Sequence, residues 1–216
     1  MLRVCLLYAE KRGYLLEAPE FEMVTVEAPN EAEQFLSEGE TALFLDTCAR
    51  VDTAWHPFFV VAFRTGLRVG ELIALQAGDA DLAQAQLHVR RRSYGGQVST
   101  PKSGRVRTVP MPPSAVEALH PVVKGKPRDA LLFAYPDGTP YDRNTPRAHI
   151  RHVARACGLR EFGIHQTRHS YASHLVQRGV SLEVIARLLG QSSPSVAARY
   201  SHLGRSALEA AVAVLP

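Results

Sequence analysis

The chain has 216 residues, 46% of them hydrophobic, with a formal net charge of +4 at pH 7 and a pI near 9.1. This length fits one substantial domain with a fragment of another. No apolar run approaches the roughly 18 residues of a membrane span, and Glu10, Lys11 and Arg12 interrupt the apolar N-terminal stretch, so we expect a soluble, cytoplasmic protein without a signal peptide or membrane contact. Three widely separated cysteines favour neither a disulfide framework nor a cysteine zinc site.

The positive charge is concentrated in part of the chain. Residues 1–50 carry ten acidic and four basic residues, whereas residues 51–216 carry eleven acidic and twenty-one basic ones. Residues 82–116 and 143–160 contain no acidic residue at all. One basic run is more often a solvated surface, but two in one small domain favour nucleic acid as a partner. The candidate DNA-binding residues are Arg90, Arg91, Arg92, Arg105, Arg107, Arg143, Arg147, Arg151 and Arg155.

The N-terminal part of the chain predicts two short segments before the main domain. Residues 1–16 are expected to form one helix, and residues 17–36, with two prolines and many glutamates, a linker. Ser37 and Glu40 have the spacing of a capping box, which opens the first helix of the main domain. We therefore expect the main domain to occupy residues 37–216.

The rest of the chain predicts mostly helices. A second helix is expected over residues 53–65 with Gly66 as its C-terminal cap, and Arg68 opens a short third helix. Residues 86–110 alternate and are broken by two glycine turns, which predicts a three-stranded antiparallel sheet with Lys102 at or beside its second turn. Further helices are expected near residues 113–123, 146–157, 165–178, 181–189, 194–202 and 205–214. The predicted fold class is mainly α with one small antiparallel sheet.

The segment from His165 to Tyr200 has residue types that suit phosphodiester chemistry. Breaking a DNA backbone with a side-chain nucleophile requires cations against the developing charge and an acid for the leaving oxygen. Tyr200 can be the nucleophile, but a phenol with an ordinary pKa of about 10 needs cationic neighbours or a base. Arginine forks suit a phosphate clamp, and Arg68 and Arg168 would form the pair. The ester formed stores the bond energy, so we expect no metal or nucleotide cofactor.

Two other patterns in this segment have simpler explanations. His165 and His169 lie four residues apart, and Glu161 lies four before them, a spacing that zinc ligands use on a helix. Gly163 is expected to interrupt that helix, so we expect no metal and predict that His169 is buried or supports the site. Tyr171 lies three residues after Arg168 and is expected to pack in the core rather than to react.

Four motifs, in order, resemble those of the tyrosine recombinase (phage integrase) family, and the resemblance covers residues from about 35 to 203. The segments are TGLRVGEL at 65–72, TPKSGRVRTVPMP from Thr100, HQTRH from His165 and ARYSHL ending at Leu203. The second resembles the family's hairpin, whose lysine protonates the leaving 5′ hydroxyl. The resemblance implies the catalytic residues Arg68, Lys102, His165, Arg168, Gln191 and Tyr200, with Glu71 and His169 as supporting residues. Glu71 could instead be a solvent-facing partner of Arg68.

Two features depart from the family pattern. Gln191 stands nine residues before Tyr200, where the family usually has histidine and sometimes tryptophan. Its amide can donate a hydrogen bond to a phosphate oxygen but carries no charge, so we expect cleavage slower by one or two orders of magnitude, from a hydrogen bond worth about 1.5 to 3 kcal/mol. The family also grips DNA between two domains, and residues 1–16 would be only the last helix of the first.

The resemblance implies a site-specific recombinase that cleaves and rejoins double-stranded DNA through a 3′-phosphotyrosyl intermediate. It would act as a homotetramer on two DNA sites, in a prokaryotic or phage setting and associated with the nucleoid. A catalytically impaired DNA-binding remnant remains an alternative, because of Gln191 and the missing N-terminal portion. A type IB topoisomerase shares the chemistry. Residues 205–214 could dock on their own domain or on a neighbouring subunit.

Overall fold

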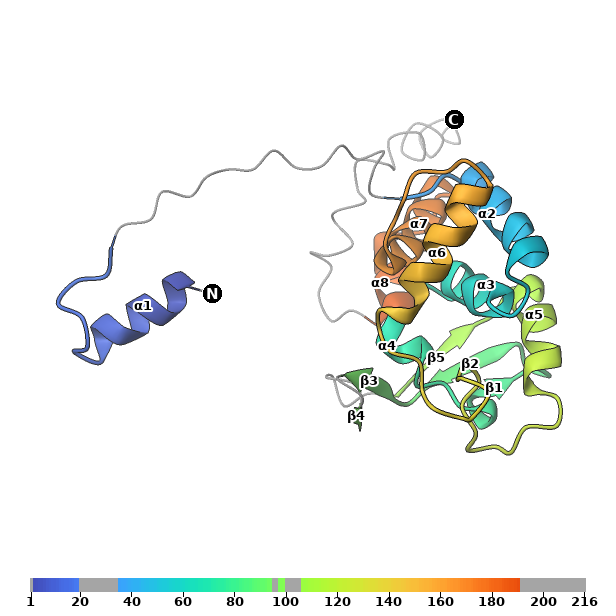
Figure 1. Cartoon of the computed structure of the whole chain (residues 1–216), viewed down its shortest axis with the longest axis horizontal. Coiled ribbons are helices and arrows are strands. Elements are labelled where there is room, and N and C mark those ends of the chain that lie inside the picture. Colours follow the sequence, from blue (N-terminus) through green and yellow to red (C-terminus); the bar gives the residue numbers. More distant parts are fainter. Residues whose placement is uncertain (1, 20–34, 95–96, 100–105, 191–216) are drawn as a thin grey trace, which may run out of the picture. The chain divides into compact units, whose positions relative to one another are not determined.

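The computed structural model describes residues 2–19, 35–94, 97–99 and 106–190 (Figure 1). The chain divides into two compact units, Met1–Glu31 and Ala32–Pro216. The first unit contains helix α1 (Leu2–Lys11), which is shorter than expected because the chain turns at Gly13, whose φ of 74° is left-handed. The helices expected over 194–202 and 205–214 lie outside the described residues.

The second unit is mainly helical, as the sequence predicts, and its helices begin and end where local signals place them. The Ser37 hydroxyl accepts the N–H of Glu40 at 3.2 Å, and the Glu40 carboxylate accepts the N–H of Ser37 at 2.8 Å. Gly66, with φ of 62°, ends the second helix of this unit. The helices are α2 (Glu38–Val51), α3 (His56–Thr65), α4 (Val69–Leu72), α5 (Pro113–Val123), α6 (Thr145–Ala156), α7 (Ile164–Gln177) and α8 (Leu182–Leu189).

Helix α3 lies at the centre of the hydrophobic core. Every residue from Phe58 to Phe63 is buried, and α3 packs against α2, α5 and α7. Phe44 of α2 meets Phe59 edge-on at 5.2 Å between ring centroids, and Phe162 at 5.1 Å. Burying each of these rings stabilises the domain by about 1.5 to 3 kcal/mol. The core therefore fixes the C-terminal end of α3, from which the chain leads directly to Arg68.

A three-stranded antiparallel sheet lies below these helices, with α5 beside it (Figure 1). Its order is β1-β2-β5, from β1 (Ala80–Asp81), β2 (Gln86–Val89) and β5 (Arg107–Pro110), with Leu87 opposite Val109. The predicted sheet is confirmed, but one strand differs from the prediction. Its third strand is β1, whereas β3 (Arg92–Tyr94) and β4 (Gln97–Ser99) form a separate two-stranded ribbon.

The ribbon leaves the sheet because the chain between β2 and β3 is held elsewhere. The Arg91 guanidinium donates to the buried carboxylate of Asp79, so β3 does not continue the line of β2. The ribbon instead packs against α4, where a Cβ added at Gly70 would lie 2.6 Å from the carbonyl oxygen of Ser93. Only glycine permits this approach, and it places the ribbon next to the turn that carries Arg68.

Helix α7 holds the point where the chain enters the second unit. The N–H of Leu36 donates to the Ser170 hydroxyl at 2.9 Å, and Nε2 of His174 donates to the Leu36 carbonyl at 2.9 Å. Burial lowers the pKa of His174, although its bond to Leu36 opposes that shift. The helix with His165 and Arg168 therefore also fixes the entry of the chain.

In the described part of the chain, no helix has the length and apolar character required to cross a membrane.

Candidate active site

Arg68 and Glu71 form the best-defined part of the site. Arg68 has extended backbone and is the N-cap of α4, so its N–H is free to donate to Glu71 Oε2 at 2.8 Å. Its guanidinium, 44% exposed, also reaches Glu71 Oε1 at 3.5 Å. Glu71 is only 4% exposed, so the solvent-facing alternative for it is wrong. The carboxylate fixes the Arg68 backbone and leaves the guanidinium partly exposed.

Arg107 supplies the second half of this arrangement from strand β5. Its Nη1 and Nη2 donate to the two carboxylate oxygens of Glu71, each at 2.8 Å. Burial raises the pKa of Glu71, but its hydrogen bonds and charge interactions with Arg107 and Arg68 outweigh burial and hold that pKa below its ordinary value. Glu71 is therefore an anion at every pH at which the protein is expected to work.

Arg168 is placed by backbone carbonyls. Its Nη1 donates to the Gly66 carbonyl at 2.7 Å and its Nη2 to the Leu189 carbonyl at 2.9 Å. These acceptors end α3 and α8, and carbonyls at helix C-termini lack partners within the helix. Arg168 is 8% exposed and joins α7 to the C-terminal ends of two helices, α3 and α8. Arg68 lies two residues after Gly66, so both arginines are fixed to the same turn.

His165 lies one turn before Arg168 on α7 and is exposed. Partial desolvation lowers its pKa, as do the positive charges of Arg168, Arg143 and Arg68. The imidazole is therefore neutral at pH 7, and it can accept a proton or, from its other nitrogen, donate a hydrogen bond. His165 shares α7 with Arg168, which binds the Gly66 carbonyl two residues before Arg68, so the three residues lie on connected elements.

Four predicted site residues lie outside the described residues: Lys102, Arg105, Gln191 and Tyr200. Their roles stay predictions. Three of them are adjacent in sequence to described elements. The β3–β4 ribbon and β5 flank the segment with Lys102 and Arg105, and Gly190, the C-cap of α8, directly precedes Gln191.

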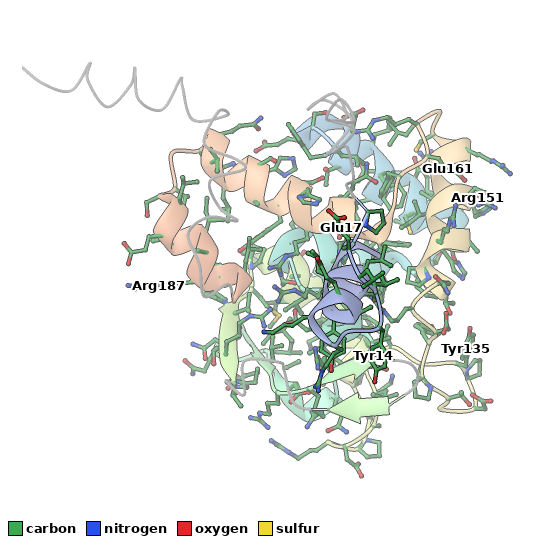
Figure 2. All side chains as sticks on the ribbon, turned by 90° about the vertical axis from the view of Figure 1, so that its left-hand side faces the viewer. Tyr14, Glu17, Tyr135, Arg151, Glu161 and Arg187 are labelled. Atoms are coloured by element: carbon green, nitrogen blue, oxygen red, sulfur yellow. The ribbon has the colours of Figure 1, made fainter. Side chains whose placement is uncertain are left out.

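Several of the basic residues grouped by sequence have acidic partners in the structure. Asp79 receives Arg91 and lies 3.7 Å from Nε of Arg90. Figure 2 shows Arg151 on α6 beside Glu161, with which it forms an exposed ion pair. Arg107, which we predict from sequence to bind DNA, instead has its fork on Glu71. DNA-binding roles for Arg92, Arg143, Arg147 and Arg155 stay predictions.

The structure bears on two further predictions, the absence of a zinc site at His165 and His169 and the packing of Tyr171. Helix α7 begins at Ile164, after Gly163, so Glu161 lies outside it and pairs with Arg151. Within the described residues, no three His, Cys, Asp or Glu side chains are grouped as metal ligands. Tyr171 packs against the apolar cluster of α7 and α8, which confirms its predicted packing, and burial raises its pKa. His169 is half-buried on α7.

Arg107 is the residue whose place in the site was missed. It lies 36 positions after Glu71, so no helix or turn spacing connects the two. The available signal was the alternation of side chains along the strand. Leu87 and Val109 lie opposite each other and must face the core. Arg107 lies two residues before Val109, so it is on the same face. A basic residue on the inner face of a strand requires an acidic partner, and the buried acid of the first motif was the candidate.

The Phage integrase family profile matches residues 29–206, and the chain belongs to this family. Tyrosine recombinase XerD of Pseudomonas putida is 32% identical over 158 residues, which are 69% of this chain and 49% of that protein. Tyrosine recombinase XerC of Rhodospirillum centenum is 30% identical over 206 residues, 90% of this chain and 57% of that protein. The chain thus spans about half the length of the curated relatives it matches.

Solved structures show the same fold. The Tn1549 transposon integrase in complex with a circular intermediate DNA aligns over 92% of this chain and 71% of its own, with a TM-score of 0.80 and 19% identity. The XerA recombinase aligns over 86% of this chain and 64% of its own, with a TM-score of 0.68 and 26% identity. The catalytic domain of bacteriophage HP1 integrase aligns over 84% of this chain and 95% of its own, with a TM-score of 0.60 and 22% identity.

Proposed function

We propose that this protein is a site-specific tyrosine recombinase that cleaves and rejoins double-stranded DNA. The observation that carries the proposal is the hydrogen bond from Arg168 of α7 to the Gly66 carbonyl, two residues before Arg68, with His165 one turn earlier on α7. Arg68 is rigid at its backbone and open at its guanidinium, which suits a residue that must receive a phosphate. Membership of the integrase family supports the same chemistry.

The reaction we propose exchanges one phosphate ester for another. The Tyr200 oxygen attacks the phosphorus, the bond from phosphorus to the 5′ oxygen breaks, and that oxygen takes a proton from Lys102. Arg68 and Arg168 neutralise the charge that develops on the phosphate, and Gln191 donates a hydrogen bond to it. Neutral His165 accepts the phenol proton. A 5′ hydroxyl from a second strand then reverses these steps and rejoins the DNA.

The assembly and setting belong to the same proposal. We infer that the protein acts as a homotetramer on two DNA sites, on chromosomal or phage DNA in the bacterial nucleoid. Residues 1–16 would be the last helix of a DNA-binding domain that precedes a linker (17–36) and the catalytic domain (37–216).

Covalent trapping tests the proposal. The full chain is incubated with nicked duplexes made from DNA that flanks its gene, and a protein–DNA adduct is sought on a denaturing gel. We expect an adduct with the wild type and with Tyr171→Phe, the matched control, and none with Tyr200→Phe. Salt-sensitive DNA binding without any adduct, also when the preceding domain is restored, would contradict the proposal and favour a binding remnant. Relaxation of supercoiled DNA without site preference would favour a topoisomerase.

A further inference from the structure

Arg107 occupies an unusual place among the basic residues of the domain. Its side chain is 16% exposed, and both of its terminal nitrogens are bound to the two oxygens of Glu71. A parallel fork of this kind has a fixed geometry and is stronger than a single contact. An arginine committed in this way does not act as a free cation at the DNA surface, although it lies in an acid-free run of sequence.

The opposite side of the same guanidinium lies against the end of α8. A Cβ added at Gly190 would lie 2.7 Å from Cδ, 2.8 Å from Nε and 2.9 Å from Cζ of Arg107. Such distances are shorter than carbon atoms tolerate, so the backbone of Gly190 is seated directly on the Arg107 side chain. Gly190 is left-handed at φ 64° and ends α8, and the next residue is Gln191.

Arg107 therefore touches two parts of the site that are far apart in sequence. Through Glu71 it reaches the backbone N–H and the guanidinium of Arg68. Through Gly190 it reaches the corner that leads to Gln191. The Leu189 carbonyl at this corner is also an acceptor for Arg168.

We propose that Arg107 is a positioning residue, which holds the Glu71 carboxylate beneath Arg68 and seats the Gly190 corner that leads to Gln191. This inference rests on the proposed function, since it gives the role of Arg107 within that site. Arg107 itself does not touch DNA. It keeps the two halves of the phosphate clamp at a fixed separation, and errors of about 1 Å in such positions slow a reaction by about a hundredfold.

Removal of the Arg107 fork should make the loss in the rate of adduct formation depend on pH. Without Arg107, Glu71 stays buried and keeps only Arg68 as a cation, so its pKa rises and it takes up a proton as pH falls. A protonated Glu71 no longer holds Arg68 as an anion does. The charged and titratable groups on α4 and on the elements packed against it are Arg68, Glu71, Arg92 of β3, Arg107 of β5, and His56 and Arg64 of α3.

The first experiment measures single-turnover adduct formation at saturating DNA between pH 5.5 and 8. We expect Arg107→Met to be about tenfold to hundredfold slower than wild type at pH 8, with nearly unchanged DNA affinity. The deficit of Arg107→Met should grow as pH falls. The deficit of the double variant Glu71→Gln with Arg107→Met should stay constant, because the carboxylate that would titrate is absent. Arg107→Lys should recover the pH profile but only part of the rate. Arg178→Met, which removes an arginine from an exposed pair with Glu38, should match the wild type.

In folded Arg107→Met, a deficit that is the same at every pH, or no deficit at all, would overturn the inference. If Arg107→Met does not fold, the double variant replaces it, because a neutral pair is often tolerated where one buried charge is not. A double variant that forms adduct at the wild-type rate would then overturn the inference. If the wild type forms no adduct, the proposed function fails. The inference is then judged by a ¹³C carboxyl titration of Glu71, which overturns it if Glu71 titrates alike with and without Arg107.

The second experiment tests the seat at Gly190. Gly190→Ala should slow adduct formation, since its Cβ pushes on Arg107. Gly179→Ala is the matched control, because Gly179 has a similar φ of 78° with no atom within 4 Å of its added Cβ. Both variants place alanine in left-handed backbone, and equal adduct rates would contradict the proposed seat.

Discussion

The second unit contains two regions of opposite chemistry, an aromatic core around α3 and a charged framework that begins at the C-terminal end of α3. The aromatic core comprises Phe44, Trp55, Phe58, Phe59, Phe63 and Phe162. The charged framework comprises Arg68, Glu71, Arg107 and Arg168. Aromatic burial is nearly non-directional, whereas the hydrogen bonds of the framework each join a particular N–H to a particular oxygen. The core therefore provides stability, and the framework determines where the reactive groups lie.

The largest effect should come from the aromatic core. Phe59 is fully buried and meets Phe44 at 5.2 Å, so Phe59→Ala should lower the free energy of unfolding by about 3 to 5 kcal/mol. Urea titration measures this loss. The molecules that remain folded at 10 °C should form adduct at the wild-type rate.

Leu43→Ala is the control for this change, because Leu43 is 43% exposed on the neighbouring helix and should change stability by less than about 0.5 kcal/mol. If Phe59→Ala slowed the chemistry of folded molecules as strongly as a framework change does, the distinction between the two regions would fail.

The next largest effect should be on the rate of adduct formation, with no change in the stability of the fold. Gln191→His introduces a donor that can carry charge at the position proposed to bind the phosphate, and a hydrogen bond to a charged group is worth about 1.5 to 3 kcal/mol. Adduct formation should therefore be about tenfold to hundredfold faster, with an unchanged melting temperature. Gln177→His, on an exposed position at the end of α7, serves as the control. A variant at Gln191 that cleaves no faster than wild type would refute the assigned role of this residue.

A smaller effect should appear where α7 holds the chain entry. His174→Ala leaves the buried carbonyl of Leu36 without its donor, which should cost about 1 to 3 kcal/mol at pH 8. The folded pKa of His174 is lowered, so the unfolded state binds more protons below the unfolded pKa of about 6.5. Wild-type stability therefore falls as pH drops through that range, and the deficit of the variant should shrink.

Denaturant titrations at pH 8, 6.5 and 5.5 measure this trend. His152→Ala, at an exposed position on α6, is the control and should be nearly neutral throughout. A deficit of His174→Ala that grows toward acid pH would have the wrong sign.

The smallest effect on stability should come from the exposed pair of Arg151 and Glu161. Arg151→Ala and Glu161→Gln break the same ion pair, and both should leave the melting temperature nearly unchanged. Their effects on DNA should differ, because only the first removes a cation. Arg151→Ala should reduce the slope of log affinity against log salt by about 1, whereas Glu161→Gln should not reduce it. Equal slopes in the two variants would exclude a phosphate contact by Arg151.

The elements that the sequence predicts well are those whose signals are local. Ser37 with Glu40 and the left-handed Gly66 act within one turn of chain, and both are found where the sequence places them. The third strand of the sheet was misplaced because Ala80–Asp81 is too short for any alternation of polar and apolar residues. Arg91 then turns the chain away from the sheet by reaching Asp79, a partner twelve positions earlier.

The site residues also divide into those whose partners are close in sequence and those whose partners are distant. Arg68 with Glu71, and His165 with Arg168, are close in sequence and form recognisable motifs. The fork of Arg107 on Glu71 depends on strand register, and sequence reasoning grouped Arg107 with the DNA-binding arginines because charge runs are counted along the chain. Acid-free runs do not account for carboxylates that tertiary structure brings to them, as Glu71 and Asp79 show.

The most direct test of the central claim is identification of the residue that carries the DNA. A trapped adduct is digested with nuclease and protease, and mass spectrometry locates the peptide with a nucleotide attached through phosphate. Attachment to Tyr200 through a 3′-phosphate is the predicted result. Attachment to Tyr171 or to any other residue, or through a 5′-phosphate, would contradict the mechanism proposed for this protein.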